Sequence, residues 1–200
     1  MSWQPFDLHP EYPPEGIPRE QLLARYGGEI MTERITRFFA ERGLEYNPHP
    51  EVVPNSMSAL RLTELARDVG RHAELHERLM DAYWSEARNI GDLDVLREEA
   101  AAAGLPADEV EDVLAGDRYR ERIESSTREA YSMGANAVPA FVLDRRLLVL
   151  GAQPETVFEQ AFEHDGQVLA ICLEVDGDLS LTEQESSDGG AINEGELELF

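Results

Sequence analysis

Hydrophobic residues follow a helical pattern through the middle of the chain and a strand pattern after it. From about residue 19 to 133, apolar positions recur at spacings of three and four residues, the period of an amphipathic helix. The clearest stripe consists of Leu62, Leu65, Ala66 and Val69. This pattern predicts a large block of helices.

Capping residues and glycines indicate where these helices begin and end. Asn55 or Ser56 can cap the helix that carries the stripe, and Gly70 can end it. Asp92 and Gly104 bound another helix in the same way. The remaining helices are expected over residues 19–42 with a break at Gly27-Gly28, over about 72–87, after Pro106, and over 117–133.

The hydrophobic period changes after Gly134. Residues 140–143 and 147–150 are short apolar runs on either side of the polar stretch 144–146, which predicts a β-hairpin. A helix over about 153–163 and a further strand within 167–174 are expected to follow.

The two ends of the chain have weaker patterns. Residues 1–6 alternate weakly and predict a short strand, and the prolines of 7–18 predict an irregular loop. Residues 176–200 are acidic and carry few large apolar side chains, which predicts a disordered tail. The order of elements indicates an α/β fold that contains a large helical insertion.

Acidic residues dominate the charge of the chain. There are 41 aspartates and glutamates against 17 basic residues, all arginine, so the formal net charge is −24. Such a surface repels phosphates and anionic lipids, so neither nucleic acid nor a membrane is an expected partner. The charge is typical of a halophilic protein, because concentrated salt screens the self-repulsion. An acidic partner-binding surface is the alternative.

Targeting signals are also missing from the sequence. The N-terminus has neither a basic patch nor an apolar run, and no stretch approaches the roughly 18 apolar residues of a membrane span. We therefore expect a cytoplasmic protein.

The chain contains one cysteine, Cys172, within an apolar run. A single cysteine excludes an intrachain disulfide and a cysteine-rich metal site. Cysteine in such a run is usually a small buried hydrophobic residue, so we expect a structural role.

Two patterns that are typical of metal sites are incomplete. His72 and His76 have the i, i+4 spacing of a zinc pair, but no third ligand accompanies them, and we expect solvated surface histidines. Residues 176–181 are superficially similar to a calcium loop, but Leu181 stands where the turn needs glycine. Neither a metal nor a cofactor is expected.

Four segments resemble the DsbA-like thioredoxin family, in its cytosolic FrnE-type branch, over about residues 3–163. They are Trp3 to Pro10; Asn55-Ser56 with Ala59, Arg61 and Leu62; Ala137-Val138-Pro139-Ala140-Phe141; and Gly151-Ala152-Gln153-Pro154 with Phe158. The resemblance implies a thioredoxin-like fold formed by residues 1–18 and 134–175, with 19–133 inserted as helices.

The same resemblance implies where a substrate would bind. In this fold a cis peptide would join Val138 to Pro139, and these two residues would hold the substrate chain. The implied partners are protein or peptide thiols and disulfides.

The chain departs from the family at its beginning. The family carries a first strand and a helix with Cys-x-x-Cys before the Trp-x-Pro-Phe segment, whereas here Trp3 is almost the first residue. We expect an N-terminally truncated sequence, with a naturally cysteine-free remnant as the alternative. The missing strand would lie beside residues 1–6, and its absence would leave two strand edges without partners.

Three functions fit these observations. The first is a FrnE-type thiol–disulfide oxidoreductase or isomerase that is inactive in this 200-residue form, so no catalytic residue is assigned. The second is a non-catalytic peptide-binding or chaperone-like module. The third is a glutathione-dependent aromatic isomerase of the same superfamily, which uses serine in place of the first cysteine. Whether the chain is an enzyme, and its oligomeric state, stay open.

Overall fold

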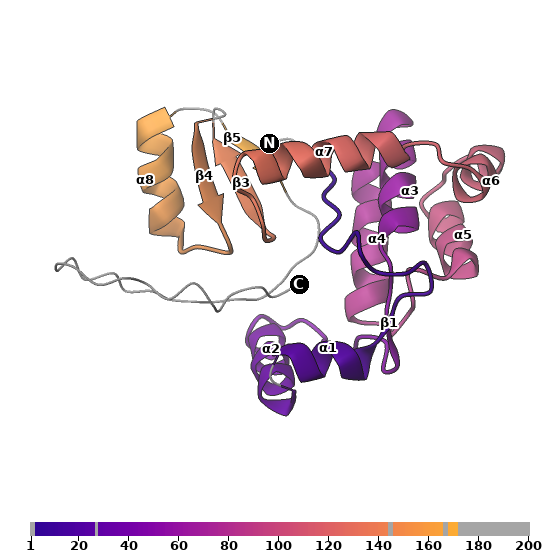
Figure 1. Cartoon of the computed structure of the whole chain (residues 1–200), viewed down its shortest axis with the longest axis horizontal. Coiled ribbons are helices and arrows are strands. Elements are labelled where there is room, and N and C mark those ends of the chain that lie inside the picture. The colour runs from indigo at the N-terminus through magenta and orange to yellow at the C-terminus, as the bar shows by residue number, and fades with distance from the viewer. Residues whose placement is uncertain (1–2, 27, 144–145, 166–167, 172–200) are drawn as a thin grey trace. The chain divides into compact units, whose positions relative to one another are not determined.

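The computed structural model describes residues 3–26, 28–143, 146–165 and 168–171, and it divides into two compact units (Figure 1). Pro5–Ser132 form the helical unit, and Met1–Gln4 with Met133–Phe200 form the sheet unit. The predicted division assigned residues 5–18 to the thioredoxin-like portion, whereas contacts group them with the helices. The amide of Asp7, for example, donates to Thr127 Oγ1 at 2.9 Å. The predicted tail lies outside the described residues.

The helical unit contains seven helices and one short ladder among its described residues, in the order β1 Ile17–Pro18, α1 Arg19–Tyr26, α2 Glu29–Glu41, β2 Val52–Val53, α3 Met57–Asp68, α4 His72–Trp84, α5 Leu93–Ala102, α6 Ala107–Ala115 and α7 Arg120–Ser132. Helices form where the hydrophobic period predicts them. None of the helices in the described ranges is both long and apolar enough to cross a membrane.

Side-chain caps and positive backbone angles fix the predicted helix ends. Asn55 Oδ1 accepts from the Met57 amide at 3.0 Å, while Ser56 makes no side-chain cap, so Asn55 is the capping residue of α3. Asp92 caps α5 in the same manner. Gly70 and Gly104 end their helices with φ of 74° and 79°, a region that glycine enters without a Cβ clash.

Helix α3 supplies the centre of the core of the helical unit. Leu62, Leu65 and Ala66 of the predicted stripe are fully buried, and α3 packs against α4, α5, α6 and α7. Val69 is the exception at 37 % exposed, because it follows the last helical turn. The α3 stripe is therefore the principal apolar seam of this unit.

The predicted strand at residues 1–6 is wrong for the described residues 3–6, which lie in no strand. Pro5 has no amide to donate to a ladder, and Phe6 is buried against the ring of Tyr131, with centroids 5.2 Å apart. The strand of this region is instead β1, which lies inside the stretch 7–18 predicted to be irregular and pairs antiparallel with β2. A Cβ on Gly16 would lie 2.3 Å from the Val53 carbonyl oxygen, so only glycine allows this close pairing.

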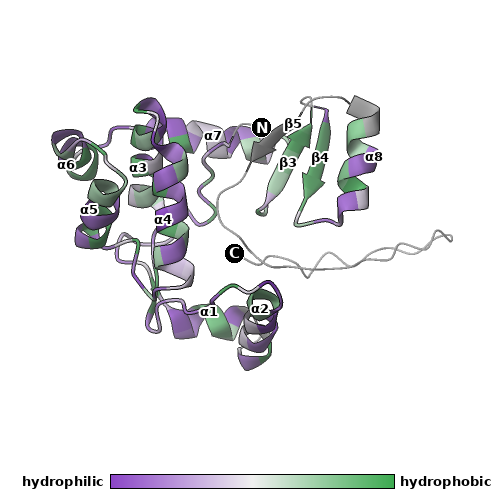
Figure 2. Ribbon diagram, turned by 180° about the vertical axis from the view of Figure 1, so that it is seen from behind, coloured by the Kyte–Doolittle hydropathy of each residue, from purple (hydrophilic) through white to green (hydrophobic). Residues whose placement is uncertain are grey.

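The sheet unit contains β3 Ala140–Leu143, β4 Leu147–Leu150, α8 Glu155–Asp165 and β5 Val168–Ile171. The order of its sheet is β4-β3-β5, with both neighbours antiparallel to β3. The predicted hairpin, the following helix and the further strand are thus confirmed. Figure 2 shows β3 and β4 almost wholly hydrophobic (green), whereas the helices carry both hydrophobic and hydrophilic (purple) residues, as amphipathic helices do.

A small core joins α8 to one face of the hairpin. Leu143, Val149 and Ala161 are buried there, and the rings of Phe141 and Phe158 meet edge to face with centroids 4.8 Å apart. This packing holds the hairpin on the helix and so fixes the position of the chain that enters β3.

Candidate functional site

The peptide bond between Val138 and Pro139 is cis, as predicted, and it stands directly before β3. The chain leaves α7, turns at Gly134 with φ of 91°, and reaches this bond within five residues. Val138 is buried with 3 % of its surface exposed, and Pro139 is partly exposed. A partly exposed proline on a buried support can contact a partner chain.

Backbone hydrogen bonds hold Pro139 at the open end of the hairpin. Its carbonyl oxygen accepts from the Gly151 amide at 2.7 Å, which extends the β3–β4 ladder one step beyond the Ala140–Leu150 pair. Gly151 takes a φ of 75°, where a residue with a Cβ is strained. Two of the resemblance segments, one around Val138 and one beginning at Gly151, therefore meet at this point.

The hydrogen bond between the Gly151 amide and the Pro139 carbonyl oxygen fixes the direction of each backbone group in β3. Hydrogen-bonded pairs alternate along an antiparallel ladder, so Phe141 and Leu143 share the orientation of Pro139 and direct their N–H and C=O groups toward β4. Ala140 and Val142 then direct theirs to the opposite edge, where they pair with Ile171 and Leu169 of β5. Each edge of β3 thus has a defined set of donors and acceptors.

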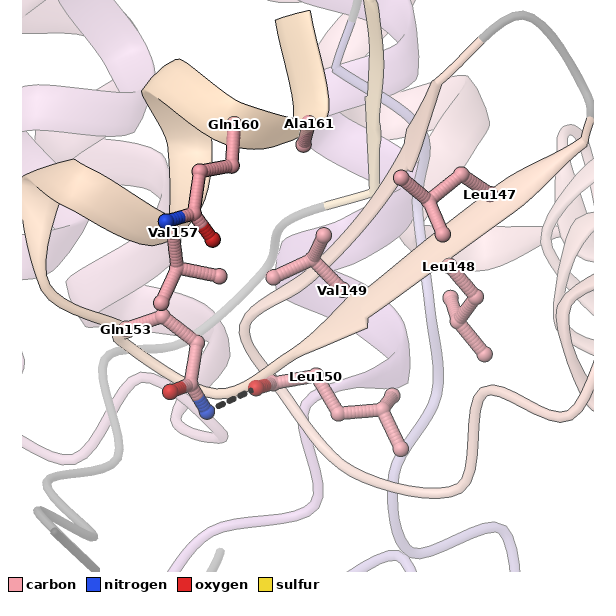
Figure 3. A pocket seen from close by; sticks show the side chains of 8 residues that line it. All are labelled: Leu147, Leu148, Val149, Leu150, Gln153, Val157, Gln160 and Ala161. Atoms are coloured by element: carbon pink, nitrogen blue, oxygen red, sulfur yellow. Dashed lines mark hydrogen bonds between the residues drawn. The ribbon is translucent and has the colours of Figure 1, made fainter. Parts of the chain in front are cut away.

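An apolar cleft of about 430 Å³ lies between β4 and α8 (Figure 3). Val149 and Val157 point toward each other there, while Leu148 and Leu150 point to the other side of the strand. Gln153 donates from Nε2 to the Leu150 carbonyl at 2.7 Å across the end of the cleft. No side chain that lines it is titratable, so the cleft offers apolar contact and no acid–base group.

His72 and His76 lie on α4 with nearly parallel rings, their centroids 5.8 Å apart. Both are half-buried rather than solvated as predicted, and burial, together with the Arg67 guanidinium, lowers the pKa of each imidazole. Arg67 Nη2 donates to His72 Nε2 at 3.1 Å, which occupies a nitrogen that a metal would need. Across the residues that the structure describes, no group of three or more His, Cys, Asp or Glu side chains is placed to hold a metal ion.

Two buried carboxylates of the helical unit were missed by the sequence analysis. Glu64 is 2 % exposed and pairs with Arg67 and Arg122, each at 3.0 Å. Glu99 is equally buried and pairs with Arg78 and Arg88. Each carboxylate is held by two guanidinium groups, which indicates a structural ion network rather than an acid–base pair. Among 41 acidic residues, no sequence signal separates these two.

Comparison with known proteins identifies the class of protein that this site belongs to. A model of the DSBA-like thioredoxin domain matches residues 1–163, and the chain belongs to that family. The thioredoxin-like fold expected from the four segments is therefore confirmed. The family is of the thiol–disulfide oxidoreductase type.

Two relatives show how far the similarity extends. The crystal structure of a probable DsbA oxidoreductase, SCO1869 from Streptomyces coelicolor, superposes with a TM-score of 0.71 at 33 % identity, covering 80 % of this chain and 72 % of that one. The uncharacterized protein YwbO of Bacillus subtilis (strain 168) is 26 % identical over 172 residues, which is 82 % of each chain.

The single cysteine of the sequence, Cys172, lies outside the described residues. The site that the structure describes consequently consists of the Val138–Pro139 segment, its support by Gly151, and the two edges of β3.

Proposed function

We propose that this chain is a FrnE-type member of the DsbA-like family that binds extended thiol- or disulfide-bearing segments of proteins at Val138 and Pro139. The observation that carries the proposal is the partly exposed Pro139 beside the buried Val138 at the entry to β3 in a DSBA-like thioredoxin domain. The buried Val138 and the carbonyl bond from Pro139 to Gly151 keep this segment in place without a ligand.

We further propose that the 200-residue chain does not complete disulfide exchange by itself. Exchange begins when a thiolate attacks a disulfide sulfur, forms a mixed disulfide and releases the other sulfur as a thiolate. A second thiol must then attack the mixed disulfide to release the product. The sequence holds one cysteine, so turnover needs a dithiol that is supplied from outside these 200 residues.

The composition supports a cytoplasmic, salt-adapted setting for this function. Its net charge of −24 favours neutral or basic partner segments over acidic ones. Thiol substrates that persist reduced are typical of the cytoplasm, where disulfides are rare.

The test of this proposal separates binding from chemistry. Binding is followed by NMR with a peptide that carries a blocked cysteine between apolar residues. We expect the largest shifts at the Val138 and Ala140 amides, and weaker binding in Pro139→Ala. Pro154→Ala, at the start of α8, is the matched control and should bind normally. Shifts confined to other parts of the chain would contradict the proposed site.

Chemistry is followed by insulin reduction with dithiothreitol as the reductant. Dithiothreitol supplies the resolving thiol, so this assay tests the first attack alone. The chain and Cys172→Ser should both match the uncatalysed rate, because the acidic residues Glu174 and Asp176 beside Cys172 disfavour an attacking thiolate and Cys172→Ser has no thiol. Catalysed turnover by either protein would show that a single-cysteine or cysteine-free mechanism operates.

The single cysteine also favours a second candidate, a non-catalytic peptide-binding module. It predicts that peptides without any cysteine bind as tightly as those with one. The first candidate predicts a preference for the cysteine-bearing peptide.

A further inference from the structure

Helix α2 has a core face and an outer face. Ile35 and Phe39 are buried, and the ring centroid of Phe39 lies 5.1 Å from that of Tyr46 and 5.7 Å from that of Trp84. Ile30 is 72 % exposed, more than any other large apolar residue that the structure describes. It precedes Ile35 and Phe39 by five and nine residues, which places it on the opposite side of the helix.

Two arginines share the outer face with Ile30. Arg34 and Arg37 follow it by four and seven residues, so the three side chains form one stripe, and both arginines are exposed. We call this stripe the outer face of α2. Within the part of the chain that the structure describes, Arg37 is the one arginine with neither a hydrogen bond nor an ion pair. Its guanidinium group can therefore bind a carboxylate from elsewhere.

The arm formed by α1, α2 and the turn after α2, residues 19–44, differs in charge from the rest of the chain. It contains five arginines and four glutamates, a net charge of +1, whereas the whole chain carries −24. Leu44, at the end of this arm, is 57 % exposed, second to Ile30 among the described large apolar residues. Exposed apolar and basic side chains together fit an acidic partner that has apolar residues of its own.

The C-terminal part of the sequence has this composition. Residues 172–200 contain nine acidic residues and no basic one, so no carboxylate there has an ion-pair partner within the segment. Its last seven residues, 194–200, read Glu-Gly-Glu-Leu-Glu-Leu-Phe and combine three carboxylates with three large apolar side chains. These carboxylates match Arg34 and Arg37, and the apolar side chains match Ile30.

Acidic side chains on the described surface match the outer face of α2 less well. Glu109 and Glu111, for example, already bind Arg118 and Arg97 at 3.0 and 2.7 Å. Such pairs would have to break before the carboxylates could bind Arg37. The complementarity therefore favours residues 194–200 over a helical face of a second copy.

We propose that the outer face of α2 is a docking surface for an acidic, apolar segment, and that its occupant is residues 194–200 of the same chain. Because the segment and α2 belong to one chain, contacts that are weak between separate molecules suffice to hold it. The contact covers Ile30 and gives Arg37 an acidic partner. It does not depend on the proposed redox function.

Paramagnetic broadening in NMR tests this contact in the full chain. Asn193→Cys combined with Cys172→Ser carries a single nitroxide label next to the segment. We expect stronger broadening at the Ile30 and Arg34 amides than at the amides of α6. Equal broadening throughout the helical unit would overturn the proposal.

A mixed sample separates contact within one chain from contact between two copies. It combines isotope-labelled chain without nitroxide and nitroxide-labelled chain without isotope. The broadening at Ile30 and Arg34 should be absent from this mixture. Broadening that persists there would overturn the intrachain contact and show that the segment binds a second copy.

A pair of arginine variants separates the outer face of α2 from net charge. Arg37→Glu replaces attraction by repulsion, and we expect it to reduce the broadening at low salt by about threefold or more. Arg128→Glu changes the net charge equally at an exposed position of α7, where Arg128 pairs with Glu121, and it should leave the broadening unchanged. Equal losses in the two variants would overturn the proposal.

The segment itself offers a second matched pair. Changing the three acidic residues within 194–200 to their amides should reduce the broadening to the same extent as Arg37→Glu. The same change to the three acidic residues within 183–188 removes equal charge and should have no effect. An effect of the second change as large as that of the first would overturn the assignment of the occupant.

Salt separates the ionic from the apolar part of the contact. At 1 M salt the Debye length is about 3 Å, so Arg37→Glu should then have little effect, whereas Ile30→Ser should reduce the broadening about threefold at both low and high salt. The Ile35 and Phe39 amides should keep their exchange protection in both variants, because the substituted side chains are exposed. If Ile30→Ser has no effect at either salt concentration, the proposal is wrong.

Discussion

The Gly151 amide donates to the Pro139 carbonyl oxygen at 2.7 Å, and this bond joins the residue after β4 to the residue before β3. The cis bond lies on one side of the contact, and the positive φ of Gly151 lies on the other. The start of the candidate site is thus supported by a residue that lies twelve positions further along the chain and acts through its backbone amide.

Gly151→Ala should destabilise the sheet unit by about 1–2 kcal/mol, the cost of placing a Cβ in the left-handed region. A steric clash does not cause this loss of stability, because the added Cβ would lie 3.6 Å from its nearest neighbour, Gln153 Nε2, which is an ordinary van der Waals contact. Urea unfolding followed by the amide signals of β3 measures the effect. Gly151→Asn is the control, because asparagine tolerates this region, and it should lose less. Equal losses for the two variants would point to a steric cause instead.

The buried carboxylates give a second prediction, for which the chain offers adjacent residues as a matched pair. Glu99 is 2 % exposed and binds Arg78 and Arg88, while the neighbouring Glu98 is exposed and binds Arg88 only at the surface. Glu99→Gln should cost about 2–3 kcal/mol, because it removes charge-assisted hydrogen bonds in a buried position. Glu98→Gln should cost less than about 1 kcal/mol. Denaturant unfolding of the helical unit compares the two, and similar values would show that burial of Glu99 adds nothing.

The period of the hydrophobic residues predicted most of the fold, because a helix or strand that buries one face carries its apolar residues at regular spacings. The α3 stripe and the hairpin formed where the pattern placed them, and the helix ends followed from local chemistry at Asn55 and Gly70. The pattern was wrong at residues 3–6, where alternation is a local property but a strand needs a partner elsewhere in the chain. The β1–β2 ladder was missed for the same reason, since it joins segments 35 residues apart.

The candidate site could be predicted only in part. The Val138–Pro139 bond followed from a short motif and a resemblance, and its cis geometry is confirmed. The support from Gly151 and the pairing of β3 with β5 depend on register, which hydrophobic residues on both strands do not specify. The half-buried state of His72 and His76 depends on neighbours such as Arg67, which the spacing on one helix does not reveal.

Asp7 predicts a dependence of stability on pH. Burial raises the pKa of its carboxyl above the ordinary value of 3.8, and the backbone amide and the charge of His9, with the charge of Arg120, oppose this rise in part. The folded state therefore binds the proton more tightly than the unfolded state. The resulting stability is present below pH 3.8 and is lost as the pH rises through the folded pKa.

Asp7→Asn should accordingly stabilise the helical unit at neutral pH, because asparagine is never charged and can still accept the His9 amide. The gain should shrink as the pH falls toward 3.8. Thermal unfolding of both proteins measures this gain over a pH series that runs from the ordinary carboxyl pKa of 3.8 up to neutral pH. A constant difference across the series would mean that packing, rather than protonation, separates the two side chains.

The net charge predicts how the 200-residue chain responds to salt. With 41 acidic and 17 basic residues, self-repulsion opposes folding at low ionic strength. Raising the salt from about 0.01 to 1 M shortens the Debye length from about 30 to 3 Å, so the repulsion between exposed carboxylates is removed. We expect the unfolding temperature to rise steeply over the first few tenths of a molar and then to level off.

Two comparisons separate screening from other effects of salt. Sodium chloride and potassium chloride should raise the unfolding temperature equally at equal ionic strength, because screening depends on the charge and concentration of the ions. Sucrose at the same osmolality should produce a smaller and more linear rise, since it acts by exclusion from the surface without screening. A variant in which four exposed glutamates, Glu15, Glu45, Glu77 and Glu86, are changed to glutamine should gain stability at low salt and converge with the wild-type chain at high salt. If the unfolding temperature is independent of salt, or if the variant keeps its advantage at 1 M, the acidic surface does not limit the stability of this fold, and the salt-adapted interpretation of its composition is wrong.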